Sequence, residues 1–104
     1  MTNRSKVETF IGFAIRTGKY KIGSNACQTL KRAKLVLVCH TASENTVDLA
    51  KKLAKKFNCK LVQTVINPLE YYVKKENAKV MAIENSDLAK SILINKESEL
   101  IELN

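Results

Sequence analysis

The chain has 104 residues and a formal net charge of +8, a length that fits one domain. Apolar residues make up 45% and charged residues 27%, close to the average of soluble globular proteins, so intrinsic disorder is excluded. No stretch approaches the ~20 apolar residues of a membrane span. The polar segment Met1–Lys6 leads into no signal-type apolar run, so we expect a cytoplasmic protein.

The first half of the chain predicts helices and strands in alternation. Apolar residues recur at helical spacing within Lys6–Thr17, and Gly18 is well placed to end that helix. Tyr20–Ile22 is short and predicted to be extended. A second helix is expected to begin in the segment 23–25, capped by Ser24 or Asn25. Its inward residues are predicted to be Ala26, Cys27 and Leu30.

Leu35–Cys39 is an unbroken apolar run, which predicts a strand covered on both faces. Thr41 is followed three residues later by Glu44, the spacing of a capping box, and the helix that follows extends to Phe57. On this helix Val47, Ala50, Leu53, Ala54 and Phe57 have helical spacing, and the opposite side carries four lysines.

The second half continues the alternation. Leu61–Val65 is predicted to be a strand, and Asn67 followed by Pro68 predicts an N-cap and first helical residue for a helix ending near Lys74. Lys79–Ile83 is predicted to be a strand. Ser86 and Asp87 are expected to cap a helix with its apolar face formed by Leu88, Ala89, Ile92 and Leu93. The acidic tail 95–104 is either an edge strand or a further helical turn.

This order predicts an α/β protein with a mostly parallel central sheet, helices on both faces and right-handed crossovers. Of the predicted strands, only Leu35–Cys39 has the composition of a central one. No composition shift or linker divides the chain, so residues 1–104 are expected to form one domain.

The positive charge is concentrated in one part of the sequence. Residues 1–64 hold thirteen basic and three acidic residues, whereas residues 65–104 hold five basic and seven acidic ones. The segment 15–34 has six basic residues and no acid. Such a one-signed field attracts polyanions, which favours nucleic acid as a partner.

Residue patterns typical of catalysis or cofactor binding are scarce. Cys39 and His40 are adjacent in a predicted strand, so their side chains point to opposite faces and cannot act as a nucleophile and base pair. The three cysteines have no metal-ligand spacing, and neither common glycine-rich nucleotide motif is present. We therefore expect no enzyme activity, no cofactor and no metal.

The segment 17–25 holds the most concentrated candidate binding residues. It joins the first two helices and brings together Lys19, Lys21, Tyr20 and Asn25. Backbone N–H groups of Ser24 and Asn25 at a helix start suit phosphate, and the Asn25 amide can also contact a base edge. The alternative is that the segment only connects the two helices and that Asn25 only caps the second one. A basic patch on a helix end and short loop suits structured RNA, which proteins recognise by bulges, bends and shape.

Four segments resemble the kink-turn RNA-binding ribosomal protein family, which includes the L-seven-Ae and L-thirty-e proteins and short bacterial relatives. They are Ile11-Gly-Phe-Ala-Ile-Arg-Thr-Gly-Lys19, Gly23-x-Asn25, Ala33-Lys-Leu-Val-Leu-Val38 and Ala42-Ser-Glu-Asn-Thr46. The resemblance is greatest to the bacterial branch and extends over about residues 5–94. It implies a three-layer α/β/α sandwich with a mixed four-stranded sheet, and RNA binding at one end of it.

In that family the start of the second helix carries the motif G-x-N-E-x-x-K, which contacts the RNA, and a loop before the last strand makes a second contact. Here Gly23 and Asn25 match, whereas Ala26 and Thr29 replace the acid and the lysine, and the second loop, residues 74–78, is polar rather than apolar. Lys31 or Arg32 is a candidate to act in place of the missing lysine. The full set of predicted RNA-binding residues is Lys19, Lys21, Gly23, Ser24, Asn25, Gln28, Lys31, Arg32, Lys34, Lys74 and Lys75.

The sequence therefore predicts a non-catalytic protein, monomeric or weakly dimeric, that binds structured RNA, with ribosomal RNA as one candidate. The replaced motif residues and the acidic, partly apolar tail leave an alternative open. It is a protein-interaction or dimerisation module on the same fold, in which the tail adds a strand to a neighbour's sheet.

Overall fold

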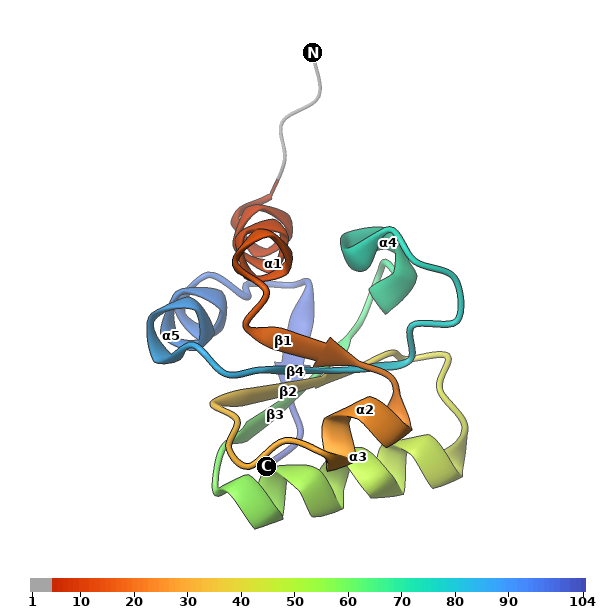
Figure 1. Ribbon diagram of the computed structural model, residues 1–104. Coiled ribbons are helices and arrows are strands. Elements are labelled where there is room, and N and C mark those ends of the chain that lie inside the picture. Colours follow the sequence, from red (N-terminus) through yellow and green to blue (C-terminus); the bar gives the residue numbers. More distant parts are fainter. Residues whose placement is uncertain (1–4) are drawn as a thin grey trace.

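The computed structural model describes residues 5–104 and is a mixed α/β fold of five helices and five strands in that range (Figure 1). In chain order the elements are α1 (Lys6–Thr17), β1 (Tyr20–Ile22), α2 (Ser24–Gln28), β2 (Leu35–Val38), α3 (Glu44–Phe57), β3 (Lys60–Thr64), α4 (Leu69–Val73), β4 (Val80–Ile83), α5 (Ser86–Ile94) and β5 (Leu100–Glu102). Among the described residues no helix has the length and apolarity needed to cross a membrane.

The strands form one sheet in the order β1-β4-β2-β3-β5. Only β2 and β3 are parallel, and the three other neighbouring pairs are antiparallel. The prediction of a mostly parallel sheet is therefore wrong, and the sheet has five strands rather than four. The reason is the place of β4, which lies between β1 and β2 and runs antiparallel to both.

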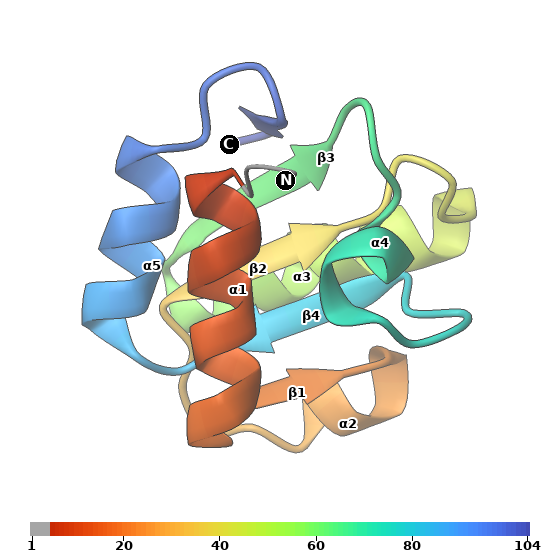
Figure 2. The same cartoon turned by 90° about the horizontal axis from the view of Figure 1, so that it is seen from above.

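Helices cover both faces of the sheet, as Figures 1 and 2 show. Residues of α1, α4 and α5 pack with Leu35 and Leu37 of β2, whereas residues of α2 and α3 pack with Val36 and Val38. The alternation of side chains along β2 thus supplies both cores, and all four of its residues are fully buried. Strand β4 is equally buried on both faces, so β2 is not the sole central strand.

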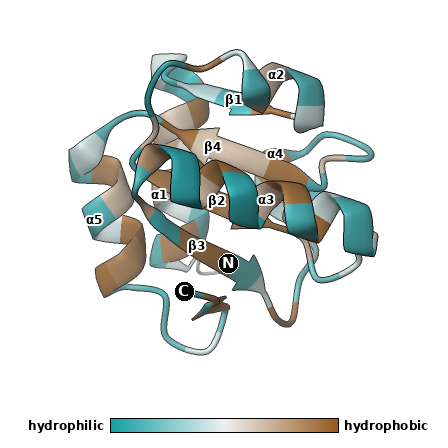
Figure 3. Cartoon of the chain, turned by 90° about the horizontal axis from the view of Figure 1, so that it is seen from below, coloured by the Kyte–Doolittle hydropathy of each residue, from teal (hydrophilic) through white to brown (hydrophobic). Residues whose placement is uncertain are grey.

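The solvent-facing side of α3 is hydrophilic, as the view in Figure 3 shows. Its buried residues are Ala50, Leu53 and Ala54, and the predicted lysine face, Lys51, Lys52, Lys55 and Lys56, is exposed. The helical pattern predicted for this segment is confirmed.

The helix ends were predicted less accurately than the helices themselves. Gly18 ends α1 in the left-handed conformation, with φ 75°, as predicted. Ser43 caps α3 and accepts a hydrogen bond from the Thr46 N–H at 3.3 Å, so the predicted capping box at Thr41 is wrong. Ser, Thr and Asn have similar N-cap preferences, and tertiary contacts decide among neighbours.

The other helix starts also differ by one residue or more. Gly23 is the N-cap of α2, so neither Ser24 nor Asn25 caps it. Pro68 is the N-cap of α4 rather than its first helical residue. Asn85 caps α5 through its side chain, which accepts from the Leu88 N–H at 2.9 Å.

The C-terminal tail forms an edge strand, one of the two predicted alternatives. Strand β5 pairs with β3, and Leu100 is buried in the core. The side chain of Asn104 accepts from the Leu61 N–H at 2.8 Å and donates to the Cys59 carbonyl at 3.0 Å. These bonds hold the described C-terminus against β3.

Candidate nucleic-acid interface

The start of α2 lies at the end of the sheet where β1 finishes. Gly23 has φ 97° and ψ 150°, a conformation that L-residues with a side chain rarely adopt, and its N–H donates to the Val80 carbonyl at 2.9 Å. This bond attaches the helix start to β4. Asn25 follows and is exposed, so its amide is accessible to a ligand.

The loop between α4 and β4 approaches the same place. Lys21 of β1, Ala26 of α2 and Lys75 of the loop line one open cavity of about 380 Å³. Both lysines are exposed, and neither forms an ion pair with another described residue. The structure thus brings two of the predicted RNA-binding residues, Lys21 and Lys75, to one cavity beside the first turn of α2.

Lys74 differs from Lys75 in having local partners. Its Nζ lies 3.8 Å from Glu8 Oε2 and 4.5 Å from the centre of the Tyr71 ring. The Tyr71 hydroxyl in turn donates to Glu8 Oε1 at 3.1 Å. Part of the Lys74 charge is therefore offset by α1, so Lys75 is the stronger candidate for a phosphate contact.

A second, larger cavity of about 650 Å³ adjoins the loop. Its lining includes Lys74 and Lys75 together with Thr41, Pro68, Glu70, Glu76, Asn77 and Lys79. Two positions of the loop, Lys74 and Asn77, have positive φ values of 58° and 60°, which shape a tight turn. Lys75 lines both this cavity and the one beside α2, so the two cavities adjoin at the loop.

A polar cluster anchors β4 to α4 at the wall of this cavity. The Lys79 ammonium donates to Glu70 Oε2 and to Thr41 Oγ1, both at 2.8 Å. The buried Cys39 sulfur accepts from the Leu69 N–H at 3.3 Å and contacts Glu70 Oε1 at 3.6 Å. The cluster therefore joins the ends of β2, α4 and β4, which hold the loop.

The cluster makes stability depend on pH. Hydrogen bonding to Lys79 holds the pKa of the Glu70 carboxyl below its ordinary value. Such a group stabilises the fold above its unfolded pKa of about 4.3, and this contribution is lost as the pH falls through the folded pKa. We expect Glu70→Gln to lower the free energy of unfolding near neutral pH, and its difference from the wild type to shrink in acid. Denaturant unfolding between about pH 7 and about pH 2 measures this.

Glu76→Gln is the matched control, because Glu76 is exposed in the loop that follows α4 and forms no ion pair with the other described residues. A Glu70→Gln deficit that stays constant across the whole pH range would assign the effect to packing rather than to the charge.

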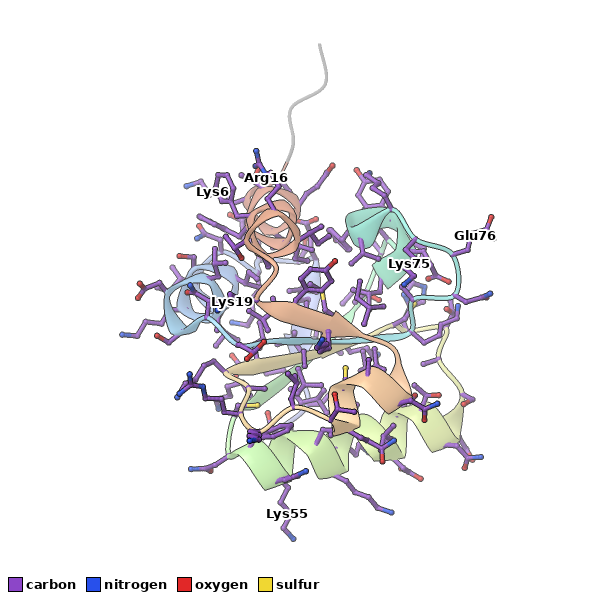
Figure 4. The ribbon with its side chains drawn as sticks, in the orientation of Figure 1. Lys6, Arg16, Lys19, Lys55, Lys75 and Glu76 are labelled. Atoms are coloured by element: carbon purple, nitrogen blue, oxygen red, sulfur yellow. The ribbon has the colours of Figure 1, made fainter. Side chains whose placement is uncertain are left out.

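Three other predicted RNA-binding residues lie at the end of the sheet where β4 finishes. Lys19, Arg32 and Lys34 line a cavity of about 220 Å³ with Glu84 and Asn85. There the Lys34 N–H donates to the Ile83 carbonyl, and the Glu84 N–H donates to the Lys19 carbonyl. Figure 4 shows Lys19 and Lys75 on opposite sides of the molecule. The basic segment 15–34 is therefore divided between two surfaces.

This division follows from the short length of α2. The helix ends after Gln28, and the chain returns to the end of the sheet where β4 finishes. Arg32 consequently lies at that end, with Lys19, Lys34, Glu84 and Asn85. Lys31 precedes Arg32 and is exposed. Gln28 is exposed on the last turn, and its side chain donates to the Ser24 carbonyl at 3.2 Å.

Cys39 and His40 have separate partners. Cys39 is buried in the polar cluster, whereas the exposed His40 bonds through its N–H and Nδ1 to the buried Thr64 hydroxyl at 3.0 and 2.9 Å. All three cysteines are free thiols, and burial raises the pKa of Cys27 to about 11. Within residues 5–104 no cluster of potential metal ligands is present.

Sequence reasoning missed Thr41, Glu70 and Lys79 as parts of this interface. Glu70 and Lys79 lie on different elements, and their ion pair follows from the placement of α4 beside the end of β4. No local sequence pattern indicates such a pair.

Comparison with models of known protein families and with curated proteins finds no match to this chain.

Proposed function

We propose that this protein is a non-catalytic RNA-binding protein that contacts bent or bulged RNA through the helix-start surface, defined as Lys21, Gly23, Ser24, Asn25, Lys74 and Lys75. Four segments of the sequence resemble the kink-turn-binding family, whose members are three-layer α/β/α sandwiches that bind RNA. This resemblance is consistent with the proposal. The observation that carries it is the meeting of Lys75 with Lys21 and Ala26 at one cavity.

Electrostatics supports the proposal. The chain carries +8, and Lys21 and Lys75 have no acidic partner among the described residues, so both charges are available to phosphates. Helix α2 has five residues and hence a small dipole, so the lysines contribute most of the attraction, and the N–H groups of Ser24 and Asn25 add directional contacts.

The polar loop changes how the RNA is held. Residues 74–77 are exposed and offer two lysines, a carboxylate and an amide where the family has an apolar contact. Phosphates and an unpaired base, rather than an apolar stacking surface, therefore suit this loop. The adjoining cavity provides the space for that base.

The preference for bent RNA should depend on Asn25. We expect Asn25→Ala to reduce the ratio of affinities for a bulged and a straight duplex by about tenfold, because the amide makes a base contact that the straight duplex does not offer. Anisotropy titration with two RNAs of equal length and charge measures the ratio.

Ser98→Ala is the control, since Ser98 is exposed in the loop before β5, far from the helix start. A wild-type protein that binds both RNAs equally well would refute specific recognition. An Asn25→Ala protein with an unchanged preference would exclude the assigned base contact.

The dimerisation module remains the second candidate because β5 is at the sheet edge and Ile101 is 46% exposed. Removing the tail would also remove buried Leu100, so the suitable test is sedimentation of the intact chain with and without Ile101→Lys. A wild-type dimer that the substitution dissociates would favour this candidate.

A further inference from the structure

A second basic surface lies at the end of the sheet away from Asn25. The opposite-end surface consists of Lys19, Lys31, Arg32 and Lys34, from the start of β1 and the loop between α2 and β2. All four residues are exposed. Backbone hydrogen bonds from Lys34 to Ile83 at 2.8 Å and from Glu84 to Lys19 at 3.1 Å hold the two segments together.

The charges on this surface are nearly uncompensated. None of its four basic residues forms an ion pair with another residue in the described range. One carboxylate, Glu84, lines the same cavity as Lys19, Arg32 and Lys34. The neighbouring Asn85 amide oxygen is occupied in capping α5. The net charge of the surface therefore stays positive, and three cations converge on one small cavity.

The two surfaces are separated along β4. Gly23 bonds to the Val80 carbonyl, whereas Lys34 bonds to the Ile83 carbonyl at the other end of the same strand. Three strand residues span roughly 10 Å, and the side chains extend outward from both ends. Figure 4 shows Lys19 and Lys75 on different sides of the molecule. An RNA segment seated at Asn25 and Lys75 therefore leaves Arg32 and Lys34 at the far end of β4 for a second segment, whereas Lys19 is only two residues from Lys21.

We propose that the opposite-end surface binds the phosphate backbone of a second duplex RNA segment, so that one molecule bridges two RNA segments. The assignment of the first segment rests on the proposed function, and the binding of the second does not. The Arg32 guanidinium can bind a phosphate through two parallel hydrogen bonds, and the lysines add point charges. Because A-form duplexes hide their base edges in a narrow groove, this contact is independent of sequence.

The test compares two double substitutions that remove equal charge. Arg32→Ala with Lys34→Ala removes two cations of the opposite-end surface. Lys51→Ala with Lys55→Ala removes two from α3, where Lys51 lies beside Glu44 and Asp48 and Lys55 points away from the sheet (Figure 4). The probe is a straight, blunt-ended RNA duplex, titrated at several salt concentrations. A second assay immobilises a bulged RNA, saturates it with protein and measures capture of the labelled duplex.

We expect Arg32→Ala with Lys34→Ala to make the slope of log K against log salt shallower by about 2, to weaken duplex binding at least tenfold and to abolish capture. The control variant should retain the salt slope, the duplex affinity and the capture of the labelled duplex. Equal losses in the two variants, or no capture by the wild type, would overturn the proposal.

Failure of the proposed function has a different signature. If the proposed function is wrong, Lys21→Glu with Lys75→Glu leaves the affinity for bulged RNA unchanged. The direct titration with the straight duplex still shows whether Arg32 and Lys34 bind RNA.

Discussion

A protein carrying Lys21→Glu together with Lys75→Glu will bind a bulged RNA on the order of a hundredfold more weakly than the wild type at about 0.1 M salt. The two residues line one cavity at the start of α2, and neither charge is neutralised by a described neighbour. Losing two phosphate contacts alone makes the salt slope shallower by about 2, and the introduced carboxylates add repulsion. Anisotropy titration across a range of salt concentrations measures both effects.

The matched control is Lys55→Glu with Lys90→Glu, which changes the net charge by the same amount at exposed positions of α3 and α5. Because long-range steering depends on net charge, the control should weaken binding modestly and leave most of the slope. A loss of affinity equal in the two variants would show that total charge, rather than the helix-start surface, determines binding.

The largest effect on stability is expected for Leu37→Ala. Leu37 is fully buried in β2 and belongs to the core formed with α1, α4 and α5. Removing its side-chain atoms leaves a cavity and costs about 2–5 kcal/mol of the free energy of unfolding, a large share of the ~5–15 kcal/mol typical of small domains. Denaturant unfolding followed by circular dichroism measures this loss.

Ile66→Ala serves as the control, since Ile66 is 64% exposed and its truncation should change the free energy of unfolding by about 0.5 kcal/mol or less. A Leu37→Ala loss below about 1 kcal/mol would contradict the central position of β2. RNA binding should persist in whatever fraction of this variant is folded, because Leu37 lies away from both basic surfaces.

The secondary structure was largely predictable because each element has a strong local pattern. The helical repeat in Lys6–Thr17 and the unbroken apolar run at Leu35 each depend only on neighbours in sequence, and both became the expected elements. Caps were less predictable. Gly23, Ser43 and Asn85 each stand beside another residue that can cap, and contacts with distant segments select the residue that does so.

The candidate interface was predicted in part. Asn25 and Lys75 were both expected at the RNA, and the structure places their segments at the same end of the sheet. The ion pair of Glu70 with Lys79 was not expected, because its 2.8 Å contact requires α4 to pack beside β4. Lys31 or Arg32 was a candidate for the missing lysine, and the short α2 and the return of the chain place Arg32 beside Lys34 and Glu84.

By itself, the sequence determined the α/β character, the helices and buried strands, and the excess of positive charge in residues 1–64. Only the tertiary structure decided that β4 enters between β1 and β2, that the tail adds β5, and that the basic residues divide into two surfaces. The physical reason is that a strand buried on both faces has the same apolar pattern in either direction and position. Its neighbours are selected by the free energy of pairing with distant segments, and that selection places Gly23 and Lys34 at opposite ends of β4.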